Sequence, residues 1–186
     1  MRGVIIAAET PGRADVRALL AEHLADMHAT SPAESVHALD LAALRVPSVT
    51  FLTARDTDGA LLGCGALSEL DPVTGHAGGL GEVKSMRTAA AARGRGVAGA
   101  VLGRLVDLAR GRGYARVSLE TGPQDYFAAA RRLYARHGFV PCGPFGAYAP
   151  DPCSVFFTLD LRAADGGTAQ VGAPAAVAAA GAGPAA

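Results

Sequence analysis

A glycine-rich loop flanked by arginines, Arg93–Gly99, contains the residue types that point most directly to chemistry. Gly94, Gly96 and Gly99 carry no side chains, so the backbone N–H groups of the loop can point together at one anion. A helical pattern starts at Gly96, and the positive end of a helix dipole favours a negative ligand there. The two arginines add full positive charges. The loop therefore predicts a binding site for phosphate groups.

Two phosphate-binding folds compete for this loop. Gly94-x-Gly96-x-x-Gly99 satisfies the dinucleotide fingerprint, and Glu120 follows about 20 residues later, where that fingerprint expects an acidic residue. The preceding strand, Glu82–Thr88, is too polar for a strand buried on both faces, and Ala89–Arg93 separate it from the first glycine. Too few residues follow Glu120 for the remaining parallel strands. A mononucleotide loop fails because no Gly-Lys-Ser/Thr occurs.

The elements that must position this loop follow from hydrophobic periodicity and turn residues. The predicted strands are Val4–Ala8, Val49–Arg55, Leu61–Leu70, Leu80–Thr88, Val117–Glu120, Phe139–Val140 and Ser154–Leu161. The predicted helices are Arg13–His28, Leu39–Leu44, Gly96–Arg112 and Phe127–Arg136. This order predicts a mixed α+β fold in which helices flank a single sheet.

The strand over Leu80–Thr88 is unusual because it is not uniformly apolar. Strict alternation places one set of side chains on a common face, and these are Glu82, Lys84, Met86 and Thr88. The opposite face then carries Val83, Ser85 and Arg87. A strand this polar is half exposed or lines a site, so it is expected to border the ligand.

Composition limits the remaining possibilities. The 186 residues suit one domain, predicted over residues 1–162, and the Ala/Gly-rich stretch 163–186 is expected to be a disordered tail. Formal net charge is zero and no tryptophan occurs, which argues against nucleic acid or an anionic membrane as partner. Three cysteines without CxxC spacing favour neither disulfides nor a metal site. With no signal or membrane segment, the expected location is the cytoplasm.

Three segments together resemble the GCN5-related N-acetyltransferase (GNAT) superfamily. Arg93-x-x-Gly96-x-Ala98 resembles its Arg/Gln-x-x-Gly-x-Gly/Ala signature, and Glu82–Thr88 resembles its fourth strand. Ala130–Phe139 resembles its Ala-x-x-Leu-Tyr-x-x-x-Gly-Phe block. The likeness spans roughly Val4 to Leu161 in the right order, and further motifs resemble a subgroup of small bacterial acetyltransferases whose acceptors are mostly unassigned.

The resemblance implies the acyl-CoA N-acyltransferase fold, with acetyl-CoA as co-substrate and no metal. The implied cofactor-binding residues are Met86, Arg87, Thr88, Arg93, Gly94, Arg95, Gly96, Val97, Ala98 and Gly99. Two positions depart from the pattern, since Ala90 stands where many relatives have Pro and Phe127 where many have Asn. The second departure concerns the residue that contacts the pantetheine arm in relatives.

Acetyl transfer to an amine needs a group that removes a proton and a group that supplies one to the leaving thiolate. Tyr134 is the candidate general acid, because a phenol with a pKa near 10 stays protonated at neutral pH. Its alternative role is that of an ordinary aromatic residue in the core. Glu82 and Glu120 are both candidate bases, with Glu120 slightly favoured by its position at a strand end.

The acceptor is expected near the variable N-terminal segment and the splayed strand. The candidate substrate-binding residues are Glu34, Ser35, His37, Lys84, Ser85 and Tyr148. A small-molecule or peptide amine is the predicted acceptor, and a homodimer is possible because exposed strands in this fold often pair. The competing function is a non-catalytic acyl-CoA-binding module, which would keep the phosphate loop but would not need Tyr134.

Overall fold

In the computed structural model, residues 3–30, 32, 41–70 and 79–162 are described. Their seven strands form one sheet in the order β1-β2-β3-β4-β5-β7-β6, in which only the β4–β5 pair is parallel. The strands are β1 (Val4–Ala8), β2 (Val49–Asp56), β3 (Leu61–Leu70), β4 (Gly79–Thr88), β5 (Tyr114–Thr121), β6 (Val140–Cys142) and β7 (Val155–Asp160). A mostly antiparallel sheet excludes the doubly wound dinucleotide fold and confirms the predicted mixed architecture.

Three α-helices and three short 3-10 helices complete the described chain. The α-helices are α1 (Ala14–Thr30), α2 (Val97–Gly111) and α3 (Ala128–Arg136). The 3-10 helices are η2 (Ala43–Arg45), η3 (Ala90–Ala92) and η4 (Asp125–Phe127). Of the helix predicted over Leu39–Leu44, the first two residues lie outside the described residues, and the remainder contains the start of the short η2, which ends two residues before Pro47.

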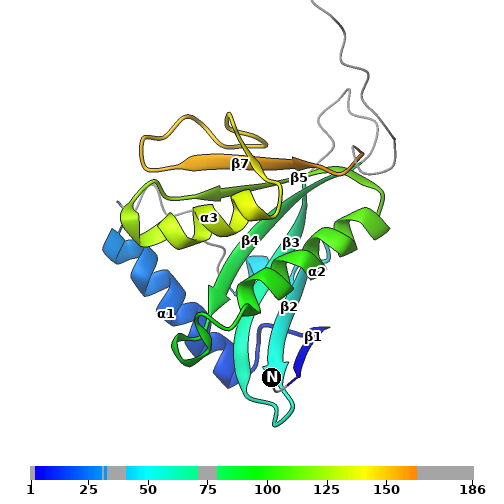
Figure 1. The fold of residues 1–186 in the computed structure, drawn as a ribbon, viewed down its shortest axis with the longest axis vertical. Helices are drawn as coiled ribbons and strands as arrows, with labels where there is room; N and C mark the ends of the chain where they lie inside the picture. The colour runs from blue at the N-terminus through cyan, green and yellow to red at the C-terminus, as the bar shows by residue number, and fades with distance from the viewer. Residues whose placement is uncertain (1–2, 31, 33–40, 71–78, 163–186) are drawn as a thin grey trace, which may run out of the picture.

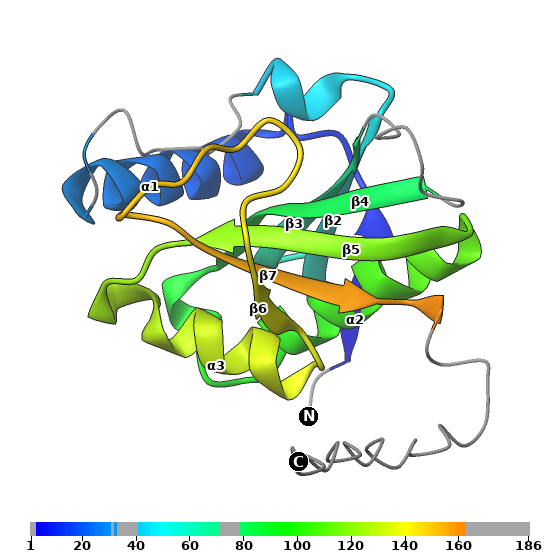
Figure 2. The same ribbon diagram turned by 90° about the horizontal axis from the view of Figure 1, so that it is seen from above.

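The helices lie on both faces of the sheet, as Figures 1 and 2 show: α2 and α3 cover one face and α1 covers the other. The larger core lies under α2, whose Val101, Leu102 and Leu105 are at most 1 % exposed. A smaller core joins Val16 and Leu19 of α1 to the other face. The apolar stripe of α2 is buried along the whole helix, whereas in α1 only Val16 and Leu19 near its start are buried and Leu24 is exposed.

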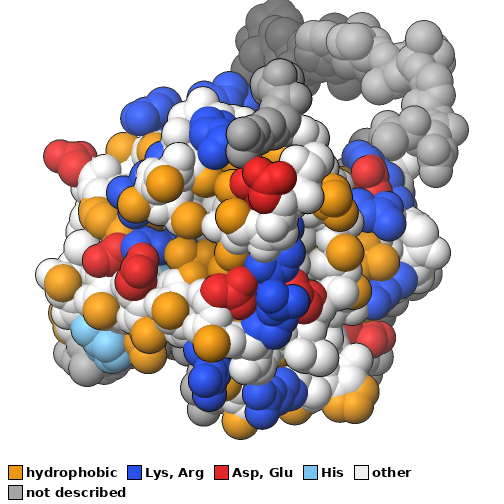
Figure 3. Space-filling model, turned by 90° about the horizontal axis from the view of Figure 1, so that it is seen from below, with side chains coloured by type: hydrophobic (Ala, Val, Ile, Leu, Met, Phe, Trp, Pro, Cys, Tyr) orange, Lys and Arg blue, Asp and Glu red, His pale blue; other side chains and the backbone are white. Residues whose placement is uncertain are grey.

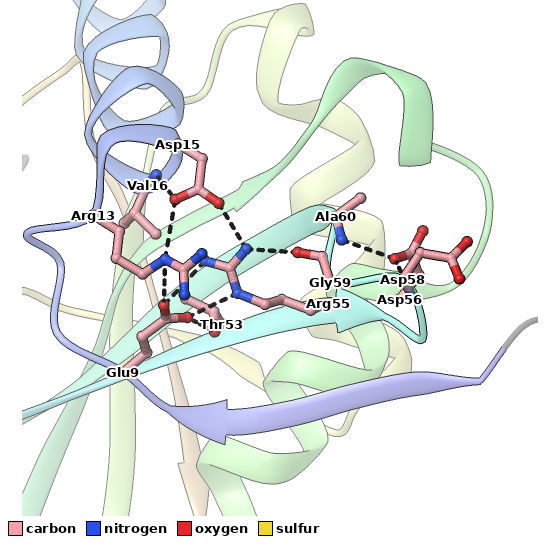
Figure 4. Close-up of polar contacts among 10 residues, drawn as sticks. All are labelled: Glu9, Arg13, Asp15, Val16, Thr53, Arg55, Asp56, Asp58, Gly59 and Ala60. Atoms are coloured by element: carbon pink, nitrogen blue, oxygen red, sulfur yellow. Dashed lines mark hydrogen bonds and ion pairs between the residues drawn. The ribbon is translucent and has the colours of Figure 1, made fainter.

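The start of α1 is tied to the sheet by the side chain of Arg55 on β2 (Figure 4). Its guanidinium lies 3.0 Å from Glu9 and 2.7 Å from Asp15, and it donates to the carbonyl of Gly59 over 2.9 Å. Thr53 donates a further hydrogen bond of 2.6 Å to Glu9. Because Glu9 follows β1 and Asp15 lies in the first turn of α1, this network holds the connection between them against the β2–β3 hairpin.

A β-bulge in β4 changes which residues share a face, and it corrects the strict alternation predicted from sequence. Lys84 pairs with Ala66 and Arg87 with Cys64, so β4 has one residue more than β3 across this stretch. The bulge is at Ser85, which has a φ of 53°. Arg87 therefore joins Lys84 on the face of α1. The side chain of Met86 was predicted to share the face of Lys84; instead its sulfur lies near Gly65 on the α2 side.

The same strand separates from β5 halfway along its length. The last parallel pair is Glu82 with Ser118, although β4 continues to Thr88 and β5 to Thr121. On its other edge β4 stays paired with β3 as far as Thr88. The two central strands therefore open into a cleft, and this opening, which no single segment of sequence specifies, positions the site.

Two groups of predicted features lie outside the described residues. They are the substrate-binding candidates Glu34, Ser35 and His37, and the tail 163–186. In the described part of the chain, no helix has the length and apolarity to cross a membrane. The face shown in Figure 3 mixes acidic and basic side chains without a large region of one sign, in keeping with a net charge of zero.

Candidate functional site

A pocket of about 310 Å³ occupies the cleft between the diverging ends of β4 and β5. Side chains from α1, η4, α3 and the β6–β7 connection complete its wall. Ten residues predicted from sequence line it: Glu82, Lys84, Ser85, Met86, Arg87, Thr88, Arg93, Glu120, Tyr134 and Tyr148. Candidates separated by more than 60 positions in the chain therefore meet in one cavity.

The predicted phosphate loop lies at one end of this cleft and has the backbone conformation that glycine permits. Gly94 and Gly96 have φ values of 73° and 79°, and Gly96 is the N-cap of α2. Among the residues that the structure describes, no heavy atom beyond the adjacent residues lies within 4 Å of the position that a Cβ would take at either glycine. The first N–H groups of a helix lack intrahelical partners, so they are free to bind an anion.

Arg93 and Arg95 are exposed on this loop, and Arg93 also lines the pocket. Val97, by contrast, is 2 % exposed in the core, which leaves only its backbone N–H for a ligand. Met86 is similar, because its side chain faces α2 while its main chain borders the cleft. The pocket is therefore bordered by the end of β4 and by Arg93, the first residue of the loop.

Tyr134 reaches the pocket from α3 and is 6 % exposed. Its ring packs against Phe139 and Phe157, with centroid distances of 6.0 and 6.4 Å. Burial raises the pKa of its hydroxyl, and the negative charge of Glu120 raises the pKa further. The phenol is therefore protonated throughout the neutral range and can act as a hydrogen-bond donor within the cleft.

Glu120 lies on β5, directly across from Phe156 of β7. One of its carboxylate oxygens accepts a hydrogen bond of 2.7 Å from the hydroxyl of Ser154. The side chain lines the pocket and is only partly buried. Its position beyond the last β4–β5 pair places a carboxylate where the cleft has begun to widen.

Glu82, Lys84 and Tyr148 form a compact triad on the α1 face of β4. Oε1 of Glu82 accepts hydrogen bonds of 2.9 Å from Nζ of Lys84 and 2.6 Å from the hydroxyl of Tyr148. Lys84 also donates to the Tyr148 hydroxyl over 2.7 Å. Burial raises the pKa of Tyr148, and the charge of Glu82 adds to the rise, so this phenol stays protonated.

A second cluster at the mouth of the cleft was not predicted from sequence, apart from Arg87. The guanidinium of Arg87 lies 2.6 Å from Asp26 on α1 and donates to Tyr126 of η4 over 3.0 Å. Tyr126 in turn donates to Asp26 over 2.6 Å. His23, one turn before Asp26, lines the same pocket. The i, i+3 spacing of His23 and Asp26 was the available signal that both face one side of α1.

His23 is uncharged in this setting. Burial lowers its pKa to about 4, and the neighbouring charge of Arg87 lowers it as well, against a smaller opposing effect of Asp26. Hydrogen bonds from Tyr126 and then Arg87 lower the pKa of Asp26. The mouth of the cleft thus carries a paired arginine and aspartate beside a neutral imidazole.

The comparisons with known proteins agree with this geometry. The family model for "Acetyltransferase (GNAT) family" matches residues 16–139. The uncharacterized N-acetyltransferase YsnE of Bacillus subtilis is 50 % identical over 146 residues, which cover 78 % of this chain and 92 % of that protein.

Two solved structures are similar in fold. A Klebsiella pneumoniae protein assigned to the acyl-CoA N-acyltransferases is 30 % identical, with a TM-score of 0.65, and the match covers 85 % of this chain and 97 % of that one. The acetyltransferase yncA of Salmonella typhimurium, solved with acetyl-CoA, has a TM-score of 0.57 at 20 % identity, over 85 % and 94 % of the two chains.

The chain belongs to the acetyltransferase (GNAT) family, and it is an acetyl-CoA-dependent N-acetyltransferase. The predicted fold and reaction class are confirmed. The alternative of a non-catalytic acyl-CoA-binding module receives no support from these relatives.

Proposed function

We propose that acetyl-CoA binds with its pyrophosphate on the Arg93–Gly99 loop and its pantetheine arm along the open edge of β4. The observation that carries this proposal is the continuity of loop and cleft, since Arg93 belongs to both. The expected pyrophosphate donors are the backbone N–H groups of Arg95, Gly96, Ala98 and Gly99. Main-chain groups from Met86 to Thr88 are the expected partners of the arm, because β5 no longer pairs with them.

The acceptor amine is then expected to enter from the α1 side and to attack the thioester directly. Glu120 takes a proton from the ammonium, and the nitrogen lone pair forms a bond to the carbonyl carbon. As the tetrahedral intermediate collapses, the nitrogen gives up its second proton to solvent and the carbon–sulfur bond breaks, which yields a neutral amide and the CoA thiolate. A backbone N–H of the splayed strand stabilises the developing oxyanion by a few kcal/mol at most.

Glu120 is the better candidate base of the two carboxylates. Oε1 of Glu82 already accepts hydrogen bonds from an ammonium and a phenol, so Glu82 is better suited to hold Lys84 and Tyr148. Glu120 accepts a hydrogen bond from the hydroxyl of Ser154 and lines the pocket, so its carboxylate borders the space that an acceptor would enter. Its place in the widened part of the cleft also suits an incoming amine.

Tyr134 is proposed as the group that donates a hydrogen bond to the leaving thiolate. Because burial and Glu120 raise its pKa, complete loss of its proton costs more than the sequence alone indicated. Its phenol is therefore expected to hold the thiolate by a hydrogen bond as the carbon–sulfur bond breaks, and to pass on its proton only as another replaces it.

The test is acetyl transfer by purified protein, measured as thiol release from acetyl-CoA with a panel of amines. Glu120→Gln should lower kcat/KM on the order of 100-fold, and the loss should shrink as rising pH deprotonates the amine without help. Glu22→Gln is the matched control, since Glu22 is exposed on α1 and does not line the pocket.

Tyr134→Phe should lower kcat while the Kd of acetyl-CoA stays near that of the wild type. Tyr114→Phe is the matched control, because Tyr114 is also buried but does not line the pocket. Thermal-shift titration completes the set: acetyl-CoA should stabilise the protein and NAD should not. An equal response to both ligands would refute the cofactor assignment, and full activity of Tyr134→Phe across pH would refute the role of that residue.

A further inference from the structure

Lys84 is the only lysine in a chain that contains 16 arginines, and it lines the pocket. An arginine guanidinium stays protonated in proteins and is not a nucleophile, whereas a lysine amine becomes one once it has lost a proton. The single side-chain amine of this protein therefore lies in the cleft where acetyl-CoA is proposed to bind.

Lys84 and its partner Glu82 are both largely removed from water. Their side chains are 11 % and 7 % exposed, and Nζ lies 2.9 Å from Oε1 of the carboxylate. Burying two charges costs free energy that their mutual attraction often fails to repay, and apolar residues of similar size are often as stable. Stability alone is therefore a weak reason for a lysine at this position.

The contacts of Lys84 supply what an attacking amine needs. An ammonium has no free electron pair, so it must give a proton to a base before it can attack a carbonyl carbon. The carboxylate of Glu82 already accepts a hydrogen bond from Nζ, and the hydroxyl of Tyr148 accepts a second one over 2.7 Å. Amine and base are thus in direct contact within the protein itself.

The expected course of the cofactor brings its thioester toward Lys84. The phosphate loop follows Thr88, so the pantetheine arm enters the cleft at that end of β4, and its thioester lies deeper, toward the last β4–β5 pair of Glu82 with Ser118. Lys84 lies between these two ends of the opening and faces α1. An acceptor amine is expected from the same side, so both amines would approach the thioester from one face of the sheet.

On the basis of the acetyl-CoA binding proposed above, we propose that Lys84 is a self-acetylation site, modified by the protein's own bound acetyl-CoA when no amine acceptor is present. Glu82 takes a proton from the ammonium, and the electron pair of Nζ forms a bond to the carbonyl carbon. As the tetrahedral intermediate collapses, Nζ gives its second proton to solvent and the carbon–sulfur bond breaks. The products are a neutral amide on Lys84 and the CoA thiolate.

This modification would also change the site. The amide carries no positive charge, so the buried carboxylate of Glu82 loses its ion pair, and the added acetyl group occupies part of the cleft. Acetylated protein should therefore transfer acetyl groups to amine acceptors more slowly than unmodified protein. The alternative is that Lys84 serves only to neutralise Glu82 within the sheet.

The experiment incubates the full chain with acetyl-CoA that carries a ¹³C-labelled acetyl group, without an acceptor. The isotope separates this reaction from any acetylation in the expression host. Trypsin does not cut after acetyl-lysine, so the label should appear in a peptide that spans Lys84, separate from the N-terminal peptide. The labelling rate should saturate with acetyl-CoA at a concentration that matches its Kd from calorimetry.

The double variant Lys84→Arg/Arg110→Lys is the matched control, because it moves the single lysine to the exposed side of α2. The side chain of Arg110 is 47 % exposed and does not line the pocket. Acetyl-CoA should label Lys84 of the wild type at least tenfold faster than the relocated lysine, since a bound thioester acts at a high effective concentration. The water-soluble reagent N-hydroxysulfosuccinimide acetate should show the opposite order, because Lys84 is buried.

The absence of label at Lys84 would overturn the proposal. So would a labelling rate that rises linearly without saturation, or a preference of both reagents for Lys84. Full activity of completely labelled protein toward an amine acceptor would overturn the inhibitory effect. If amines are acetylated but Lys84 is not, only this inference fails. If acetyl-CoA neither stabilises the protein nor releases thiol with any acceptor, the proposed function itself fails.

Discussion

The substitution Gly96→Ala tests whether the loop before α2 binds phosphate, and its two effects have different physical causes. Gly96 has a φ of 79°, a left-handed conformation that costs an alanine about 1–2 kcal/mol. No atom lies within 4 Å of the position of the added Cβ, so no steric clash contributes within the described residues. For a domain of this size the melting temperature should fall by about 2–8 °C.

The second effect concerns the ligand. The new methyl group would stand at the N-cap of α2, where the phosphate oxygens are expected to approach the backbone N–H groups. Loss of one charge-assisted hydrogen bond, worth about 1.5–3 kcal/mol, should raise the Kd of acetyl-CoA at least tenfold. Isothermal titration calorimetry measures this Kd, and differential scanning fluorimetry measures the melting temperature without ligand.

Gly103→Ala is the matched control, because Gly103 lies within α2 and also has open space around its would-be Cβ. An alanine in a helix interior is preferred over glycine by about 1 kcal/mol, so this variant should melt about 2–4 °C higher than the wild type with an unchanged Kd. A Gly96→Ala variant that binds acetyl-CoA as tightly as the wild type would refute the phosphate assignment.

Two further predictions concern charged groups. Arg55→Met should destabilise the protein by about 2 kcal/mol, because the partly buried Glu9 loses its guanidinium partner and Asp15 at the start of α1 loses its ion pair. The measurement is the midpoint of urea unfolding at pH 7. Since the hydrogen bond from Arg55 lowers the pKa of Asp15 in the folded state, this stability is present above the ordinary aspartate pKa of about 4 and is lost as pH falls below it. The variant should therefore lose less stability than the wild type on acidification, and parallel curves would contradict the role of the pair. His23 should titrate near its folded pKa of about 4 in an NMR pH series, and Arg87→Met should raise that value, because one repelling charge is gone; a midpoint near 6.5 in the wild type would show that the imidazole is solvated. Because this pKa is depressed, folding is disfavoured as pH drops from about 6.5 toward 4, where the unfolded chain binds the proton first.

Most of the fold was predictable because its signals are local. Apolar spacing placed α1 and α2 within two residues of their observed ends, and the strands predicted over Val49–Arg55 and Leu61–Leu70 are observed as the antiparallel pair β2 and β3. Strand β5 begins three residues earlier than expected, at Tyr114, because its pairing with β4 and β7 recruits residues with weaker strand patterns. The pairing of two copies through an exposed strand stays a prediction.

The candidate site also contains residues that local sequence signals predicted and residues that they did not. The glycines of the phosphate loop and the Tyr134 block were recognisable from residue types at fixed spacing, because a backbone that approaches an anion admits few alternatives. The faces of β4 were predicted wrongly beyond Ser85, since one inserted residue reverses the alternation and a bulge has no clear local signature. Strict alternation thus hid the fact that Lys84 and Arg87 share a face.

Residue types at short spacing, together with their resemblance to the GNAT family, were therefore enough to indicate an acetyltransferase built on one mixed sheet. Only the tertiary structure decided where β4 and β5 part, and this parting creates the cleft. It also decided that Tyr148 reaches Glu82 from 66 residues away and that Asp26 reaches Arg87 from 61. Such contacts depend on where neighbouring strands separate and on where a loop packs against the sheet. The partners of a charged side chain are therefore set by the tertiary arrangement and not by its neighbours in sequence.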